Sequence, residues 1–157
     1  MLPEPLNEHS IAVALSGFDE AAVTGGKFEH QELTLEINPA HIVSACGFLK
    51  HEQGFARLST VTAVDWYPSE PRFEVVYHLH SLSHNRRLRL KCKVPGATPA
   101  IDSVCSVWRS ANWYEREVFD LFGINFFNHP NLKRIMLPED WEGHPLRKDF
   151  PITGNRV

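Results

Sequence analysis

The sequence predicts an α+β fold: a two-layer domain in which a mixed, mostly antiparallel sheet packs on helices, followed by an extended C-terminal segment. Between residues 30 and 94, apolar and polar residues alternate in several runs, which is typical of half-buried strands. Other segments combine helix-start signals with apolar residues at helical spacing. After Gly123, recurring prolines exclude a long helix, although large apolar residues stay frequent. We therefore expect an α+β domain over residues 1–123. Residues 124–157, here called the strap, should be an extended partner-docking segment of that domain.

The first third of the chain predicts a helix, a strand and a second helix. LNEHSIAVALSG (6–17) has the pattern of a short helix that ends at a glycine. A weak strand over 21–24 should lead into a turn at Gly25-Gly26, and the alternation in HQELTLEI (30–37) predicts a strand. Asn38-Pro39 supplies an N-cap and a first-turn proline, which predicts a helix that ends near Gly54.

Three further strands are predicted in ARLSTVTAVDWY (56–67), RFEVVYHLH (72–80) and RRLRLKCKV (86–94). A turn around Ser83-His84-Asn85 should make the last two an antiparallel hairpin. The third strand places apolar residues on one face and cations on the other: Arg87, Arg89, Lys91 and Lys93. We interpret this cationic face as a solvated sheet face. The alternative is a docking surface for an acidic protein partner.

The region before the strap predicts mainly helix. Thr98-Pro99 should begin a helical region whose apolar residues share helical spacing: Ile101, Val104, Cys105 and Trp108. Asn112 to Glu115 has the form of a capping box, so a helix should run from there to Phe122 and end at Gly123. Arg116 and Asp120 should then lie opposite its apolar stripe. One short helix is expected in the strap around residues 131–135.

Composition excludes several classes of function. A net charge of -3 and a pI near 6.3 disfavour a nucleic-acid-binding protein. The three cysteines are far apart and form no CxxC motif, which disfavours a zinc or iron–sulfur site within this chain. We find no secretory signal, and no apolar run approaches the roughly 18 residues of a membrane span. We therefore expect a soluble protein with reduced thiols.

No catalytic motif is present. The serines lie outside any GxSxG context, and neither GxGxxG nor a phosphate loop occurs. His78 and His80 share one side of a strand, but no third ligand has a fixed spacing, so we interpret them as solvent-facing. Glu115, Glu117 and Asp120 could form an acid/base cluster, yet helix capping and surface pairing account for two of them. The chain is predicted to be a binding or structural component, with no catalytic, cofactor-binding or metal-ligating residue. A free-standing metal-dependent enzyme is a remote alternative.

The block NWYEREVFDLFGINFFNHPNLKRIMLPEDWEGHPLRKDFP (112–151) resembles a known family. It is similar to the C-type, 30-kilodalton subunit of the proton-pumping NADH:quinone oxidoreductase, respiratory complex I. That family's hallmarks are Glu-Arg-Glu with a following acidic-apolar group, His-Pro, a basic-apolar pair and a closing Gly-His-Pro-Leu-Arg-Lys-Asp. TAVDWYP (62–68) and FEVVYHLHS (73–81) also resemble the family, in order and spacing.

The resemblance implies a non-catalytic structural or assembly subunit of the complex's peripheral arm, at the cytoplasmic face of the inner membrane. The complex transfers electrons from NADH to quinone and couples this to proton translocation. Flavin and iron–sulfur clusters would reside in partner subunits, and the 49-kilodalton or D subunit, which carries the quinone site, would be the main neighbour. The alternative is the equivalent subunit of a membrane-bound hydrogenase, an F420 dehydrogenase or a photosynthetic-type complex.

The resemblance also implies a partner interface built from the matched motifs. Its expected residues are Glu115, Arg116, Glu117, Asp120, His129, Arg134, Trp141, His144, Pro145, Leu146, Arg147, Lys148 and Asp149. Trp141, Leu146 and Phe150 should be buried anchors, and Arg147 should form a bidentate pair with a carboxylate or a group of carbonyls. We further hypothesise that Arg116 and at least one glutamate form ion pairs that seat the strap or the partner. The alternative is that the strap folds back on its own domain.

Overall fold

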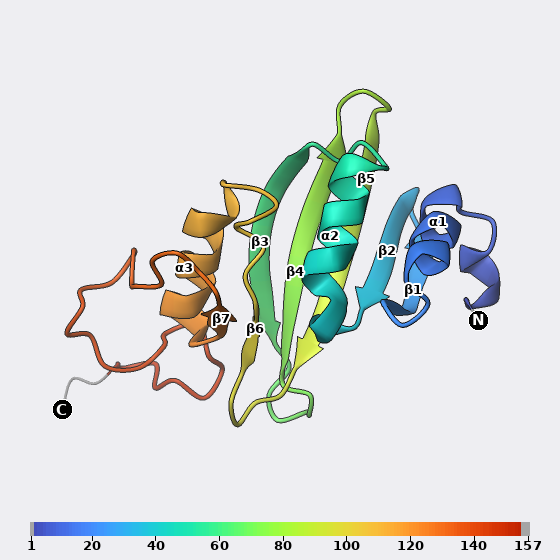
Figure 1. Cartoon of the computed structure of the whole chain (residues 1–157). Coiled ribbons are helices and arrows are strands. Elements are labelled where there is room, and N and C mark those ends of the chain that lie inside the picture. Colours follow the sequence, from blue (N-terminus) through green and yellow to red (C-terminus); the bar gives the residue numbers. More distant parts are fainter. Residues whose placement is uncertain (1, 155–157) are drawn as a thin grey trace.

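A five-stranded mixed sheet forms the centre of the computed structural model, which describes residues 2–154 (Figure 1). Its strands are β1 (Val23–Glu29), β2 (Glu32–Ile37), β3 (Arg57–Asp65), β4 (Phe73–Ser81) and β5 (Arg86–Val94). They lie in the order β1-β2-β5-β4-β3, and every neighbouring pair is antiparallel except β2 with β5. The predicted α+β class with a mixed, mostly antiparallel sheet is confirmed.

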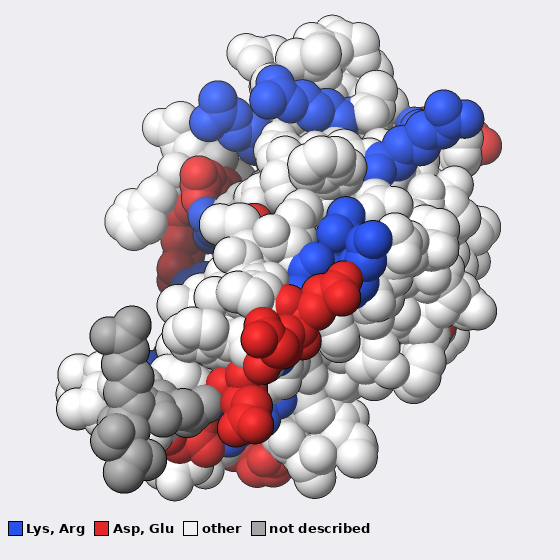
Figure 2. All heavy atoms as spheres, turned by 90° about the vertical axis from the view of Figure 1, so that its left-hand side faces the viewer, with Lys and Arg blue, Asp and Glu red and all other residues white. Residues whose placement is uncertain are grey.

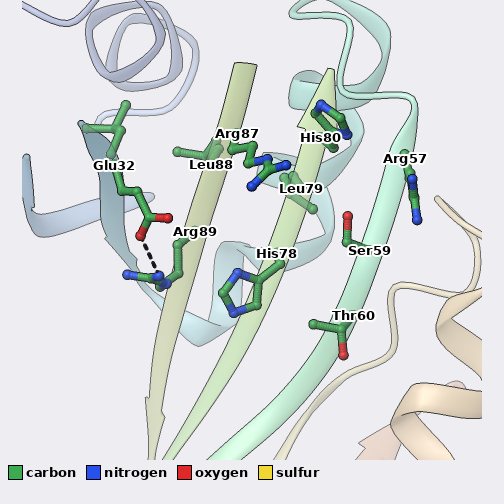
Figure 3. Close-up of a pocket in the computed structure, with 11 residues that line it drawn as sticks. Glu32, Arg57, Ser59, Thr60, His78, Leu79, His80, Arg87, Leu88 and Arg89 are labelled. Carbon is green, nitrogen blue, oxygen red and sulfur yellow. Dashed lines mark hydrogen bonds and ion pairs between the residues drawn. The ribbon is translucent and has the colours of Figure 1, made fainter. Parts of the chain in front are cut away.

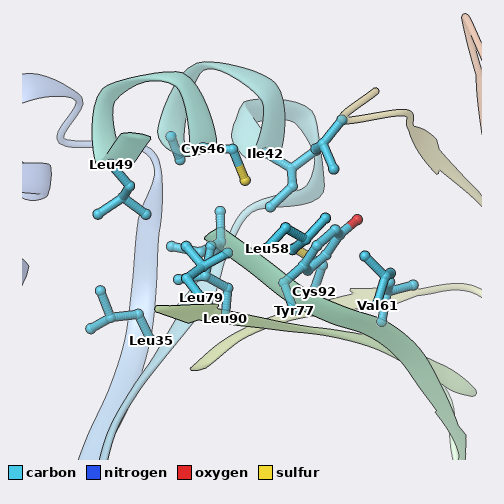
Figure 4. Close-up of a cluster of buried hydrophobic side chains, with 14 of the residues drawn as sticks. Leu35, Ile42, Cys46, Leu49, Leu58, Val61, Tyr77, Leu79, Leu90 and Cys92 are labelled. Carbon is cyan, nitrogen blue, oxygen red and sulfur yellow. The ribbon is translucent and has the colours of Figure 1, made fainter. Parts of the chain in front are cut away.

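The core lies between one face of this sheet and helix α2 (Ile42–His51), which Figure 1 shows lying across the sheet. Ile42, Cys46 and Leu49 of α2 point toward Tyr77 and Leu90 of the sheet, and all five are fully buried (Figure 4). Helix α1 (Ser10–Phe18) follows a short 3-10 turn (Glu4–Leu6) and lies beside β1 and β2. The opposite face of the sheet is not covered by α2.

A second unit lies beside β3. Strands β6 (Ala100–Asp102) and β7 (Asn125–Phe127) pair in parallel, and helix α3 (Ala111–Phe122) connects them. This β-α-β arrangement places α3 against β3. The strap begins with β7 and then runs past α3 without forming a helix over its described residues (Figure 1).

Several local predictions are confirmed. β4 and β5 form the predicted antiparallel hairpin, with residues of the RFEVVYHLH and RRLRLKCKV segments in register from Phe73–Val94 to Ser81–Arg86. Asn38 caps the turn before α2, because its side chain accepts a hydrogen bond from the Ala40 amide at 3.1 Å. α3 ends at Gly123, which adopts the left-handed conformation with φ of 74°.

The prediction of a turn at Gly25-Gly26 is wrong. Both glycines lie within β1, which continues to Glu29, and the turn to β2 falls at His30-Gln31 instead. A Cβ atom on Gly26 would lie 2.4 Å from the Thr34 carbonyl oxygen, so this glycine allows the two strands to approach. The glycine pair therefore marks a close strand contact and not a reversal of the chain.

The helical region predicted from Thr98-Pro99 is also absent. Residues 100–102 form β6, and turns follow up to residue 108. The buried carboxylate of Glu115 accepts hydrogen bonds from the Ser103 hydroxyl and the Val104 amide, at 2.6 and 2.7 Å, which fixes these turns. The capping box is wrong for the same reason: Glu115 faces inward, and α3 begins at Ala111. The short helix predicted around 131–135 does not form.

Candidate functional site

The strap is fastened to α3 by one buried carboxylate. Asp120 is fully buried, and its Oδ2 atom accepts three backbone hydrogen bonds from consecutive strap amides, those of Ile135, Met136 and Leu137, at 2.7–3.1 Å. Its Oδ1 atom binds the Arg134 guanidinium at 2.8 Å. Burial opposes ionisation of Asp120, but these donors outweigh it, so the pKa lies below its usual range. Asp120 was predicted to lie opposite the apolar stripe of this helix, and the structure shows that its carboxylate is buried beneath the strap.

Two arginines bind carbonyl oxygens of the same region. Arg116 donates to the carbonyls of Lys133 and Arg134, both at 3.1 Å. Arg134 also donates to the Gly143 carbonyl at 3.1 Å, which ties two parts of the strap together. The hypothesis that Arg116 and at least one glutamate form ion pairs that seat the strap or the partner stays a prediction where a partner is concerned. Among the described residues, Arg116 holds the strap. It does so through backbone carbonyls.

The closing Gly-His-Pro-Leu-Arg-Lys-Asp segment of the strap packs against the C-terminal end of α3. The His144 ring contacts the Asp120 carbonyl at 2.9 Å, the Leu146 amide donates to the Leu121 carbonyl at 3.0 Å, and Arg147 donates to the Phe122 carbonyl at 2.6 Å. These are among the last carbonyls of a helix, which lack partners within it. Arg147 also lies over the ring of Phe73, 5.2 Å from its centroid. The strap therefore completes the C-cap of α3.

A second fastening lies at the junction of β3 and β4. Arg72 binds Asp65 at 2.8 Å and Asp149 at 2.7 Å, so one guanidinium joins the sheet to the strap. Asp65 also accepts the Lys148 amide at 2.8 Å. The hydrogen bonds from Arg72 hold the pKa of Asp65 at about 2, although burial opposes this. The strap is thus held at two carboxylates on two different elements.

Glu115 and His129 form a third, internal contact. His129 Nε2 contacts the Asn112 carbonyl at 3.1 Å, and its Nδ1 accepts the Asn131 amide at 3.0 Å. Its proton is therefore on Nε2, which lies 3.9 Å from the Glu115 carboxylate. Burial raises the pKa of Glu115. This network fixes the start of the strap against α3.

Cys105, Glu115 and His129 are the one group in the described residues that could hold a metal ion. Both nitrogens of His129 are already used in hydrogen bonds to the backbone. Burial raises the pKa of the Cys105 thiol to about 11, and that thiol donates to Glu115. The polar atoms of this cluster are thus engaged in hydrogen bonds with one another and with the backbone. His78 and His80 have no third ligand within reach among the described residues.

The residues predicted at a partner interface divide into two groups. Glu115, Asp120 and the side chain of His129 are fully buried within the chain, so they reach a partner only through the strap that they hold. The exposed group consists of Glu117, Trp141, Leu146, Lys148 and Asp149. Trp141 and Leu146, which were predicted as anchors that a partner buries, are 41% and 51% exposed in this chain. Arg116, Arg134, His144, Pro145 and Arg147 lie between these extremes.

The strap folds back on its own domain, which was the alternative prediction, and still exposes large apolar side chains. Met136 and Phe127 of this segment are 64% and 52% exposed, and Trp113 of α3 is 67% exposed. Figure 2 faces this side of the molecule and shows acidic side chains gathered mainly in its lower half. This side of the molecule therefore combines exposed apolar side chains with acidic ones.

Asp65 and Arg72 were not singled out from the sequence. A signal was available for Asp65: it has the same parity along β3 as the buried Val61 and Ala63, so its carboxylate lies at an inward position. A carboxylate placed inward requires a partner. Nothing local indicates that this partner would be Arg72 or that Asp149 would join it.

The helices within residues 2–154 are all too short, or too polar, to cross a membrane. The longest, α3, has 12 residues, against roughly 20 for a span.

Comparison with known proteins places these features in a family. Residues 35–156 match the family described as respiratory-chain NADH dehydrogenase, 30 Kd subunit. The chain is 50% identical over 123 residues to the C-type subunit of NADH-quinone oxidoreductase from Geotalea uraniireducens (strain Rf4), covering 78% of this chain and 75% of that protein.

Two solved structures are also similar. One is Nqo5, solved as a trypsin-resistant fragment, with a TM-score of 0.64 and 32% identity over 68% of this chain and 88% of that chain. The other belongs to a membrane-bound sulfane sulfur reductase, an archaeal respiratory membrane complex, with a TM-score of 0.77 and 27% identity over 93% of this chain and 86% of that chain. The chain therefore belongs to the family of the C-type, 30-kilodalton subunit of NADH-quinone oxidoreductase.

Proposed function

We propose that this chain is a non-catalytic subunit of the peripheral arm of NADH:quinone oxidoreductase and acts through the surface that its fastened strap presents. One observation carries the proposal. Asp120 and Asp65 hold the strap in place, while Trp141, Leu146 and Met136 remain exposed on it. A preformed apolar surface loses little conformational entropy when it binds, which favours docking to another subunit.

The absence of a catalytic role is part of the proposal. The buried polar groups beside the strap are engaged in hydrogen bonds that fix backbone segments, as at Glu115 and Asp120. Flavin, iron–sulfur clusters and quinone would therefore be bound by partner subunits, with no redox centre held by this chain. The partner proposed for the strap surface is the 49-kilodalton, D-type subunit. The complex would lie at the cytoplasmic face of the inner membrane.

Co-purification tests this proposal. The full-length chain carrying an affinity tag is isolated from native membranes, as wild type and as Trp141→Ala/Leu146→Ala. We expect the double variant to retain its thermal midpoint, because both side chains are about half exposed, and to recover several-fold less of the D-type subunit. Leu82→Ala is the matched control, since Leu82 is 65% exposed in the β4–β5 turn, away from the strap. Equal recovery with the double variant and the control would refute the proposal.

A second candidate is the equivalent subunit of a related respiratory membrane complex. The similarity to a chain of the sulfane sulfur reductase complex extends over 93% of this chain, and this observation supports the second candidate. The same purification separates the two, because NADH:quinone oxidoreductase should bring flavin-binding, NADH-oxidising subunits with it. Their reproducible absence from an intact complex would favour the second candidate.

A further inference from the structure

A groove of about 450 Å³ lies across strands β2, β5, β4 and β3. Figure 3 shows its polar lining on one side of the sheet, with Arg57, His78, His80, Arg87, Arg89 and Glu32 among the residues drawn. These residues alternate along their strands with core residues such as Leu79 and Leu88, so their side chains lie on the face opposite α2. Within residues 2–154, no helix covers this face.

The strand register gathers basic side chains into a row. Arg57 of β3 pairs with His80 of β4, and His80 pairs with Arg87 of β5, so three basic residues lie side by side across three strands. Two residues further along β5, Arg89 pairs with His78. Arg57 and Arg87 thus flank His80 from the two neighbouring strands, so both guanidinium groups border the same stretch of the groove.

Only part of this charge is neutralised within the chain. Arg89 binds Glu32 at 2.7 Å, whereas the side chains of Arg57 and Arg87 are exposed and make no ion pair or hydrogen bond with any residue that the structure describes. Within the same residues, Nε2 of His80 is buried and has no hydrogen-bond partner. The groove is therefore basic in a chain whose net charge is -3.

The residues that line the groove indicate which class of ligand it could bind. It contains no Phe, Tyr or Trp on which a nucleobase could stack. The overall negative charge of the chain also opposes a long polyanion or an anionic membrane surface. A short acidic protein segment needs only local charge complementarity. Arg57 and Arg87 lie two strands apart across β4, roughly 10 Å by the usual strand spacing, a distance that two carboxylates of one short segment can span.

We propose that this groove binds an acidic, extended segment of a neighbouring subunit, whose carboxylates pair with Arg57 and Arg87. This second docking surface is separate from the strap and rests on the proposed function only in that it needs neighbouring subunits. It would fix the sheet side of the domain, while the strap fixes the α3 side.

Site-specific cross-linking in the intact complex tests the proposal. A photoreactive p-benzoylphenylalanine replaces Ser59, which is half-buried and lines the groove. Irradiation of native membranes should link it to a peptide of another subunit that contains at least two Asp or Glu residues. Adding Arg57→Glu/Arg87→Glu should lower the yield roughly tenfold, as expected for two exposed ion pairs. Changing the partner's carboxylates to lysine should restore it.

Arg109→Glu/Arg86→Glu makes the same charge change at exposed positions that do not line this groove, and should leave the yield unchanged. Should the groove variant fail to assemble, Arg57→Gln/Arg87→Gln replaces it. A cross-link to lipid, to a segment without carboxylates or to nothing would overturn the proposal, as would equal yields for the groove and control variants. An intact groove cross-link, together with unchanged recovery of the D-type subunit by Trp141→Ala/Leu146→Ala, would contradict the proposed function alone.

Discussion

Replacing Asp120 by asparagine should release the strap from α3. The amide has the same shape, but one of its two positions now carries hydrogens. These hydrogens must face either the three amides of residues 135–137 or the guanidinium of Arg134, and all of these groups are donors. Arg134, whose side chain is 15% exposed, also loses its counter-charge. Breaking one side of a buried pair costs about 3–5 kcal/mol, which is roughly two to four powers of ten in the equilibrium that closes the strap.

Hydrogen exchange followed by mass spectrometry measures this release. In Asp120→Asn, the amides of residues 135–137 should lose protection, while those of β4 should stay protected, because they exchange only when the sheet itself opens. Glu117→Gln is the matched control: it removes a carboxylate from an exposed position of the same helix. The reasoning would be refuted if the two variants exchanged alike within about 0.5 kcal/mol.

Three further variants probe other contacts of the strap. Asp65→Asn should flatten the acid side of the stability curve: the folded pKa of about 2 lies below the ordinary 3.8, so this carboxylate stabilises the fold above pH 4. That stabilisation, about 2 kcal/mol, is lost as pH falls toward 2. Denaturant unfolding at pH 6 and pH 2.5 measures the difference in unfolding free energy between the two pH values. If this difference were the same in the variant and the wild type, the assignment would be contradicted. Gly123→Ala should destabilise the protein by at least about 1 kcal/mol in thermal unfolding, because φ is 74° and the new Cβ would lie 2.6 Å from the His144 ring; wild-type stability would show that the strap does not press on this position. Arg116→Ala should increase proteolytic cleavage of the strap, whereas Arg116→Lys, which keeps one donor group, should increase it less; identical cleavage in both would argue against the two carbonyl contacts.

Much of the central sheet follows from local sequence pattern. The alternation in RFEVVYHLH and RRLRLKCKV sets both the strands and their inward faces, because one face of each strand is buried. The Asn38-Pro39 start and the Gly123 stop of the helices also depend on nearby residues alone. Such features are predictable because the groups that satisfy the backbone lie within a few positions in the sequence.

The failed predictions share one cause. Residues 98–108 have apolar residues at helical spacing, yet pairing of β6 with β7 and the hydrogen bonds from Glu115 decide their conformation. Arg116 finds carbonyl oxygens 17 and 18 residues away, and Asp65 finds the strap 83 residues away. Partners this distant in sequence carry no periodic signal, so the local pattern could not show them.

A chain that acts through docking and not through chemistry should affect how many complexes form, and not how fast each one works. The most direct test is NADH:quinone turnover of purified complexes that contain Trp141→Ala/Leu146→Ala, normalised to bound flavin. We predict fewer complexes but wild-type turnover per flavin. Normal assembly combined with reduced turnover per flavin would contradict a role in docking alone.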